Sequence, residues 1–179
     1  EITTRLVGSE MCIRDRKHRM GHFGLSLEEE KSRLIEFGRY AKERCRKAGT
    51  KLGTFTFLGF THYCSKSRNG RFRVKRKTSK KKFAKKCREV NLLLVKMRTC
   101  RLKEMIAKLN QILTGYYHYY GITDNTESIT AFRYNIMRSL FYCLNRRSQT
   151  KSYNWVEFLN MLDNSYPLVR PRIYVNIYE

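Results

Sequence analysis

The sequence predicts an α+β fold that is mostly α-helical, and three observations predict it. Aromatic and β-branched residues alternate with polar residues through positions 54–77, which indicates strands. From Ser79 onward, apolar residues recur at helical spacing in successive segments. Hydrophobic residues make up 41% of the 179-residue chain, which is enough to build a core.

The strand region predicts a β-hairpin with one cationic edge. Asn69-Gly70 is the signature of a type I′ turn, in which both central residues have positive φ. Beyond this turn, Phe72 and Val74 face one side of the strand. The cations that face the other side are Arg71, Arg73, Lys75 and Lys77. Before the strands, residues 41–53 are polar and contain two glycines, which predicts a loop.

The helical region begins at Ser79, a residue type that can cap a helix. The predicted helices share a 3.6-residue apolar period and cover about 79–97, 101–117, 127–145 and a shorter stretch after Ser152. Gly121 is expected to end the second helix, and Asn125 or Thr126 to cap the third. Pro167 and Pro171 predict an extended tail, and residues 173–178 fit a last strand.

The charge of the chain favours a polyanionic partner. Lys and Arg number 38 against 15 Asp and Glu, so the formal net charge is +23 and the pI is about 10.1. Lysine and arginine that neutralise phosphates release condensed counterions, so we expect nucleic-acid binding. A membrane surface or an acidic protein is the alternative partner. Apolar runs are too short to span a bilayer, and a cytoplasmic location is expected.

The cysteines do not predict a metal site. The chain has six, at irregular spacing and without a C-x-x-C pair: Cys12, Cys45, Cys64, Cys87, Cys100 and Cys143. Zinc sites need paired ligands at regular spacing. We therefore expect reduced, partly buried thiols and no metal in this chain.

Residues 66–88 form the densest cationic block, with thirteen Lys and Arg and no acid. On a hairpin leading into a helix, this block predicts contact with an RNA backbone. A solvated helix face is the alternative, although such a face usually carries acids that pair with its lysines. The helical cations of this candidate site are Lys80, Lys81, Lys82, Lys85 and Lys86.

Two further clusters are candidates for RNA contact. In the tyrosine-rich stretch 113–121, Tyr116 and Tyr120 lie on the apolar stripe and fit the core, whereas Tyr117 and Tyr119 are expected to be exposed and able to stack on bases. The second cluster is Arg146, Arg147 and Lys151. Its arginines offer forked donors to phosphate, but they also complement a helix C-terminus, and both interpretations stay open.

The chain shows no enzymatic constellation. It has no Asp-Asp pair, nucleophile elbow or phosphate-binding loop, and its four histidines have no partner at a telling spacing. Residues 6–16 resemble a translated transposon-end sequencing adaptor. We therefore expect residues 1–16 to be disordered and unrelated to the fold, with the genuine protein sequence beginning at Lys17 in the middle of a domain.

Four motifs, in this order, resemble the C-terminal part of a group II intron reverse transcriptase/maturase. They are Phe23-Gly24-Leu25-Ser26-Leu27 with Glu30-Lys31-Ser32, Phe57-Leu58-Gly59-Phe60, Leu113–Gly121, and Asn145–Gln149 with Trp155 and Phe158. The resemblance implies a partial palm with a primer-grip-like hairpin over 17–78, a helical thumb and maturase-specific domain over 79–165, and a tail over 166–179.

The resemblance also implies roles for single residues. Lys31 would lie near the incoming nucleotide, Phe57, Leu58, Gly59 and Phe60 would support the primer end, and Arg146 and Arg147 would contact intron RNA. The implied partners are group II intron RNA and an RNA template–primer duplex. Full-length relatives use Mg²⁺, held by aspartates of a motif that this chain lacks, so we expect it to be inactive as a polymerase by itself.

The function expected on this basis is binding of intron RNA to assist splicing, in a bacterial ribonucleoprotein. One alternative is a fragment of an intron-like or CRISPR-associated reverse transcriptase without a role in splicing. The other is a basic protein that coats nucleic acids in general.

Overall fold

The computed structural model describes residues 14–26, 28, 35–67, 69–147 and 152–178. The chain divides into two units, Glu1–Gly53 and Thr54–Glu179. In the first unit, residues 14–21 are helical and helix α2 spans Ala41–Lys47. The prediction for residues 1–16 falls mainly on positions outside the described residues and stays a prediction. The described helices and the antiparallel sheet confirm an α+β fold that is mostly helical.

Helix α2 corrects the prediction of a loop at residues 41–53. Ala41 and Cys45 lie one turn apart, and both are buried. Arg44 forms an ion pair with Glu36, which precedes the helix. A helix of seven residues has few buried positions, and most residues of α2 are polar. The helical spacing of its apolar residues is therefore too short to recognise in the sequence.

A three-stranded antiparallel sheet opens the second unit. Its strands are β1 (Thr54–Phe57), β2 (Phe60–Lys66) and β3 (Phe72–Thr78), hydrogen-bonded in that order. Thr54 pairs with Tyr63, and Phe60 pairs with both Phe57 and Thr78. The predicted hairpin at residues 54–77 is therefore confirmed as the β2–β3 pair.

The type I′ prediction at Asn69-Gly70 is wrong. Gly70 has a φ of +74°. The N–H of Gly70 donates to Ser67 O, and the N–H of Ser67 donates to Arg71 O, so this loop is longer than two residues. A longer loop needs only one left-handed residue, and Gly70 supplies it.

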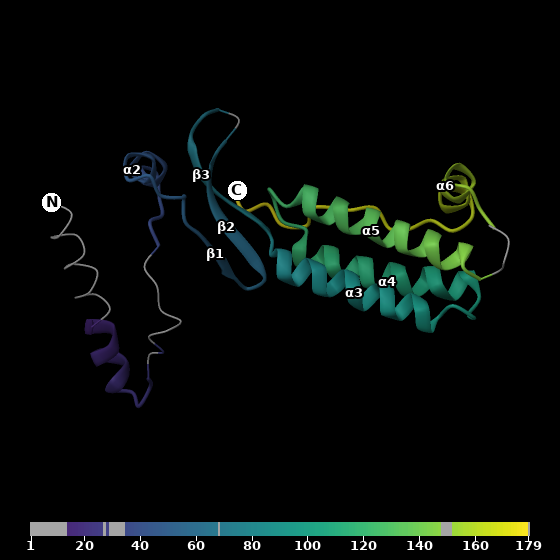
Figure 1. Cartoon of the computed structure of the whole chain (residues 1–179), viewed down its shortest axis with the longest axis horizontal. Helices are drawn as coiled ribbons and strands as arrows, with labels where there is room; N and C mark the ends of the chain where they lie inside the picture. Colours follow the sequence, from purple (N-terminus) through teal and green to yellow (C-terminus); the bar gives the residue numbers. More distant parts are fainter. Residues whose placement is uncertain (1–13, 27, 29–34, 68, 148–151, 179) are drawn as a thin grey trace. The chain divides into compact units, whose positions relative to one another are not determined.

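Helices α3 (Lys80–Lys96), α4 (Leu102–Tyr120), α5 (Thr126–Asn145) and α6 (Trp155–Asn164) confirm the four predicted helical segments. Within the second unit, α3, α4 and α5 lie side by side, with the sheet at one end and α6 near the other (Figure 1). Their apolar stripes form one core, whose fully buried side chains include Leu94, Met105, Leu113, Phe132 and Phe158.

The helix ends differ in part from their predicted caps. Ser79 occupies the N-cap position of α3, but its side chain makes no capping hydrogen bond. The backbone N–H of Ser79 instead donates to Gly59 O at 2.8 Å, which ties α3 to the first turn of the sheet. Gly121 follows α4 as predicted, and a Cβ there would collide with Tyr117 O and Arg172 O.

Asn125 precedes α5 as predicted, but its side chain joins three elements instead of capping the helix. Its Oδ1 accepts from the N–H of Thr78 at 2.8 Å, and its Nδ2 donates to Tyr120 O at 2.8 Å. The Asn125 side chain is fully buried. A buried amide with these partners fixes the ends of β3 and α4 beside the start of α5.

The C-terminal tail returns along the helices to the sheet (Figure 1). Asn110 on α4 donates to Pro167 O at 3.0 Å and accepts from the N–H of Val169 at 2.9 Å. Among described residues 173–178, Val175 makes one isolated parallel bridge, with Ile122, so the last strand suggested by the sequence is wrong. The tail contacts α4, the residues after it and β3, and it does not extend the sheet.

Candidate nucleic-acid interface

The cations of β3 are partly used inside the fold. The guanidinium of Arg73 lies 3.5 Å from the centroid of the Tyr178 ring, and Lys77 lies 5.0 Å from that of Tyr63. The hydroxyl of Tyr178 donates to Val74 O at 3.0 Å and also bonds Asp124. Burial and this bond to Asp124 raise the pKa of Tyr178 to about 12, so its hydroxyl stays protonated. The C-terminal tail thus covers the strand at Arg73.

The lysines of α3 are the more open cations. Lys80, Lys81, Lys82 and Lys85 are exposed, and the first turn of α3 contains no acid. A helix N-terminus carries a partial positive charge, so lysines there raise the energy of the free protein. A bound phosphate would relieve this repulsion, which makes the start of α3 a favourable place for an anion.

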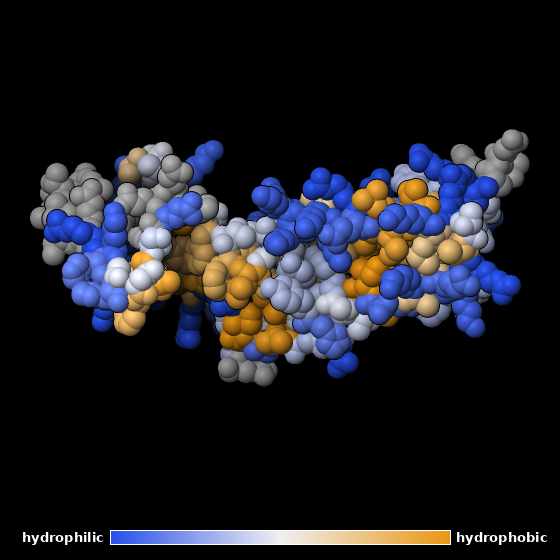
Figure 2. All heavy atoms as spheres, turned by 90° about the horizontal axis from the view of Figure 1, so that it is seen from below, coloured by the Kyte–Doolittle hydropathy of each residue, from blue (hydrophilic) through white to orange (hydrophobic). Residues whose placement is uncertain are grey.

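A cavity of about 420 Å³ lies between α3 and α4, and we call it the lysine–tyrosine groove. It is lined from α3 by Lys82, Lys85, Lys86 and Glu89. It is lined from α4 by Gln111, Ile112, Gly115, Tyr116, Tyr119 and Tyr120. In the view from below, blue hydrophilic side chains lie beside a paler surface at the middle of the helices (Figure 2). The groove therefore combines cations with aromatic rings.

The charge of the groove is mainly uncompensated. Lys86 Nζ lies 3.1 Å from Glu89 Oε2, an i,i+3 pair between half-exposed side chains. Lys82 and Lys85 bring two further positive charges to the same cavity. An exposed ion pair contributes little to stability. The groove accordingly keeps a net positive charge and suits a polyanion.

The residues Phe57–Phe60 lie next to this groove because the first turn of the sheet packs on the tyrosines of α4. The hydroxyl of Tyr119 donates to Leu58 O at 2.8 Å. The ring of Phe60 stacks on Tyr119 at 5.9 Å and meets Tyr120 edge-on at 5.2 Å between centroids. Phe57 and Leu58 remain more than half exposed at the tip. The structure thus joins two motifs that are far apart in the sequence.

The prediction that Tyr117 is exposed is wrong, whereas that for Tyr119 is confirmed. Tyr117 is fully buried, and its hydroxyl donates to Val169 O at 3.3 Å. Burial raises the pKa of Tyr117 to about 12. Its ring has no free face for a base, because the helix turns Tyr117 toward the tail. Tyr119 is 53% exposed.

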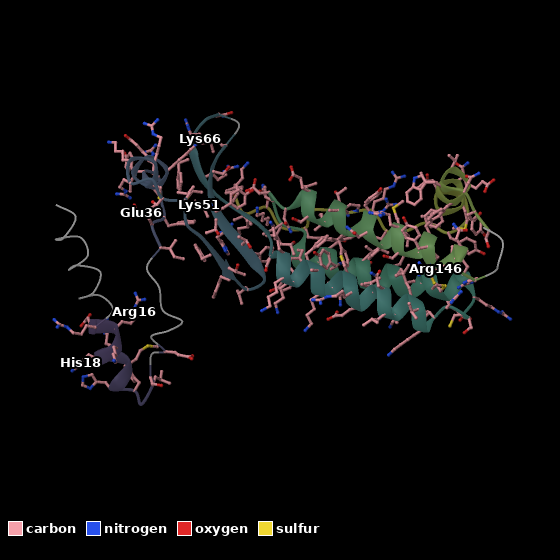
Figure 3. The ribbon with its side chains drawn as sticks, viewed as in Figure 1. Arg16, His18, Glu36, Lys51, Lys66 and Arg146 are labelled. Carbon is pink, nitrogen blue, oxygen red and sulfur yellow. The ribbon has the colours of Figure 1, made fainter. Side chains whose placement is uncertain are left out.

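The two arginines after α5 have different environments. Arg147 donates to Cys100 O at 3.0 Å and contacts the sulfur of Met105, so it links the end of α5 to α4 and the loop before it. Arg146 is exposed at the end of α5 near α6 (Figure 3). Arg147 is exposed as well, but its guanidinium already bonds within the fold, so Arg146 is the better candidate for contact with a phosphate. Lys31, Ser148, Gln149 and Lys151 lie outside the described residues.

The sequence interpretation missed part of the groove. Gln111, Gly115 and Tyr119 are spaced four residues apart and face it together from α4. That i, i+4, i+8 spacing is visible in the sequence, but it does not identify the helix on the other side. The pairing of this face with the lysines of α3 depends on tertiary packing.

Within the described ranges, no three His, Cys, Asp or Glu side chains group as metal ligands would. No helix in the described part of the chain has the length and apolar character needed to cross a membrane.

The fold and the groove define a basic, mostly helical region with a groove lined by lysines and tyrosines. Residues 80–157 match the family described as Group II intron, maturase-specific domain. The match covers α3, α4, α5 and the start of α6, and it points to a maturase function in group II intron splicing, with the intron RNA as partner. Neither the curated proteins nor the solved structures gave a match to the chain.

Proposed function

We propose that the chain holds structured group II intron RNA in the lysine–tyrosine groove and along the first turns of α3, and that this contact assists splicing. The observation that carries the proposal is the joint lining of one cavity by Lys82, Lys85 and Tyr119. The lysines would bind the sugar–phosphate backbone, and the aromatic wall would accept an unpaired nucleotide beside it. The family match over residues 80–157 supports this proposal.

The charges are arranged for backbone contact. Lysine is a flexible point charge, and it attracts phosphate without reading a base. Lys80 and Lys81 extend the positive surface from the groove toward the start of α3. An RNA strand that enters the groove would pass these lysines and the turn at Phe57–Phe60.

The first experiment removes the groove charges. We expect Lys82→Gln with Lys85→Gln to weaken binding of a group II intron transcript roughly tenfold or more at about 0.1 M salt. The slope of log K against log[salt] should fall by roughly 1.5, because each lost phosphate contact contributes about 0.7–0.9. Filter binding at several salt concentrations measures both quantities.

The matched control is Lys96→Gln with Lys103→Gln. It removes the same charge from exposed positions that do not line the groove, one on α3 and one on α4. We expect a much smaller loss of affinity and an almost unchanged slope. If the control pair loses as much as the groove pair, only the overall charge of the chain matters and the groove is not the site.

A second experiment tests preference for the intron. Arg146→Ala should reduce the ratio of intron affinity to affinity for an unrelated structured RNA more than it reduces overall binding. The reason is that a guanidinium fork recognises a particular phosphate geometry. An equal loss on both RNAs would leave Arg146 as an ordinary cation at a helix end.

We further propose that residues 17–78 are the end of a reverse transcriptase palm and that the helices also serve as its thumb. The docking of the turn at Phe57–Phe60 on the tyrosines of α4 supports this proposal, since a primer-grip hairpin must be held rigidly beside the duplex. The template–primer duplex, the Mg²⁺ of the full-length enzyme and the bacterial cytoplasm stay predictions. Purified chain should give no primer extension with Mg²⁺, and template-dependent product would overturn that expectation.

A further inference from the structure

A second cavity, of about 520 Å³, lies on α5 and α6 and shares no residue with the lysine–tyrosine groove. Five residues line it: Tyr134, Arg138, Phe141, Tyr142 and Trp155. We call it the arginine–aromatic groove. Four of its five lining residues are aromatic, and none is an acid.

The α5 side of this groove is a ladder of exposed side chains. Tyr134, Arg138 and Tyr142 are spaced four residues apart, so they follow one another along one face of the helix. The guanidinium carbon of Arg138 lies 5.9 Å from the ring centroids of both tyrosines. Each tyrosine is 52% exposed, so these rings are not part of the core.

The other side is formed by Trp155 at the start of α6. Its ring meets Phe141 edge-to-face, with centroids 5.1 Å apart and planes at 81°. It meets Tyr134 in the same way, at 6.3 Å and 72°. Phe141 and Trp155 also pack on the buried ring of Phe158. The rings that stay open to a planar ligand are therefore those of the half-exposed Tyr134 and Tyr142, with the edge of the Trp155 ring beside them.

We propose that the arginine–aromatic groove binds an unpaired nucleobase of an RNA strand, which stacks on an aromatic face while Arg138 contacts the adjoining phosphate. The inference rests on the proposed function only in that its ligand is RNA. Stacking uses the π face that every base has, and a guanidinium supplies both a flat surface and forked donors. Bases within a duplex keep their faces covered, so the ligand is a single-stranded loop, bulge or end.

Charge decides between this ligand and an apolar protein segment. An apolar segment would bury the charge of Arg138 without an anion to pair with it, which is costly. A nucleotide supplies both the aromatic plane and the anion that this lining lacks. The net charge of +23 favours the nucleotide further.

The two grooves would then have different tasks. The lysine–tyrosine groove attracts backbone of any sequence, and its contribution depends on salt. The arginine–aromatic groove requires an accessible base, and its contribution depends on the secondary structure of the RNA.

The test uses the only tryptophan of the chain, which lies in the groove itself. The full chain is titrated with a six-nucleotide adenosine RNA, with a strand of the same length and backbone but without bases, and with a short blunt RNA duplex. We expect the adenosine strand to quench Trp155 fluorescence and the other two ligands to leave it almost unchanged. Equal quenching by the strand without bases would overturn the proposal.

Single substitutions locate the base. Tyr134→Ala and Tyr142→Ala should each weaken binding of the adenosine strand roughly tenfold, the usual scale for loss of one stacked base. The control is Tyr40→Ala, which removes an exposed tyrosine from the other unit and should change nothing. Unchanged affinity and quenching in both groove variants, with circular dichroism equal to that of the parent chain, would also overturn the proposal.

The two proposals fail separately. If Lys82→Gln with Lys85→Gln has no effect beyond its control but the adenosine strand still quenches Trp155, the lysine–tyrosine groove is refuted and the base site stands. If the lysine variant behaves as expected but no strand quenches Trp155, the base site is refuted alone.

Discussion

The two turns of the β-sheet share a glycine at the second position but are held in different ways. Asn69-Gly70 between β2 and β3 has the preferred composition of a tight turn, yet it lies in a longer loop, in which the N–H of Ser67 donates to Arg71 O. Leu58-Gly59 between β1 and β2 has a less favourable composition, yet both residues have positive φ, +46° and +81°. The turn with the weaker sequence signature has the type I′ geometry.

Tertiary contacts explain the difference. Leu58 O accepts from the hydroxyl of Tyr119, and Gly59 O accepts from the N–H of Ser79. By contrast, a Cβ at Gly70 would meet nothing within 4 Å. A left-handed leucine costs about 1–2 kcal/mol, and it persists where surrounding contacts fix it. The strained turn is the one that lies against the tyrosines of the proposed RNA groove.

Replacing each of the two turn glycines by alanine should give the largest difference in stability between the two turns. Gly70→Ala forces alanine into a positive φ, but its Cβ would meet no other atom. We therefore expect a loss of about 1 kcal/mol in the free energy of unfolding. Gly59→Ala requires the same conformation, and its Cβ would lie 2.9 Å from the hydroxyl oxygen of Tyr120. Since Tyr120 packs on Phe60, we expect a loss of about 2 kcal/mol or more. Urea unfolding of both variants measures this, and equal losses would show that the contact with Tyr120 is unimportant.

Exchanging the residue types at the first positions of the two turns should change the free energy of unfolding by less. At Leu58 this change should stabilise the protein. Leu58→Asn creates Asn-Gly at the turn with two left-handed residues, and we expect a gain of about 0.5–1 kcal/mol because asparagine tolerates this conformation. Leu58 is 66% exposed, so little burial is lost. Asn69→Leu should be nearly neutral, since Gly70 already supplies the left-handed residue that this longer loop needs. Destabilisation by Leu58→Asn would mean that the leucine side chain makes a contact that outweighs the strain.

These turns also mark how much the sequence can predict. The helices were predicted because their apolar period reflects one core, and α3, α4 and α5 bury the expected stripes. The type I′ position was wrong because turn composition is a local preference, whereas contacts from α4 fix Leu58. Tyr117 was placed wrongly because it lies at the edge of the stripe, where the returning tail covers it.

The candidate site could be predicted only in part. A lysine-rich stretch is visible in the sequence, but the sequence does not show that Arg73 is covered by Tyr178 while Lys82 and Lys85 line a groove. It also does not show that Trp155 meets Tyr134 from another helix. Both grooves are formed by pairs of helices, so their existence depends on packing that no single segment encodes.

Removing one hydroxyl should test how firmly the first turn is held. Tyr119→Phe keeps the ring that stacks on Phe60 but removes the donor to Leu58 O. Because Tyr119 is exposed, water can replace this donor, and we expect a loss of about 0.5 kcal/mol in urea unfolding. In the Leu58→Asn background the loss should be smaller, since the turn then needs less support. A full loss in both backgrounds would show that the hydroxyl does not act through the turn.

The smallest expected effect concerns His62, which lies on β2 between the two turns. It pairs with Phe55 on β1 and Arg76 on β3, and its ring stacks on Phe55 with centroids 4.7 Å apart. Burial first, and then the charge of Arg76, lower the pKa of His62 below its ordinary value of 6.5. The unfolded chain therefore takes up this proton at a higher pH than the folded chain does. The stability that neutral His62 contributes is complete above pH 6.5 and is lost as the pH falls through 6.5 toward the folded pKa.

Urea unfolding at several pH values should show a shallower decline in stability with falling pH for His62→Gln than for the parent chain. An identical decline in both proteins would mean that His62 titrates alike in the folded and unfolded states, and that the sheet between the two turns is more open to water than its packing indicates.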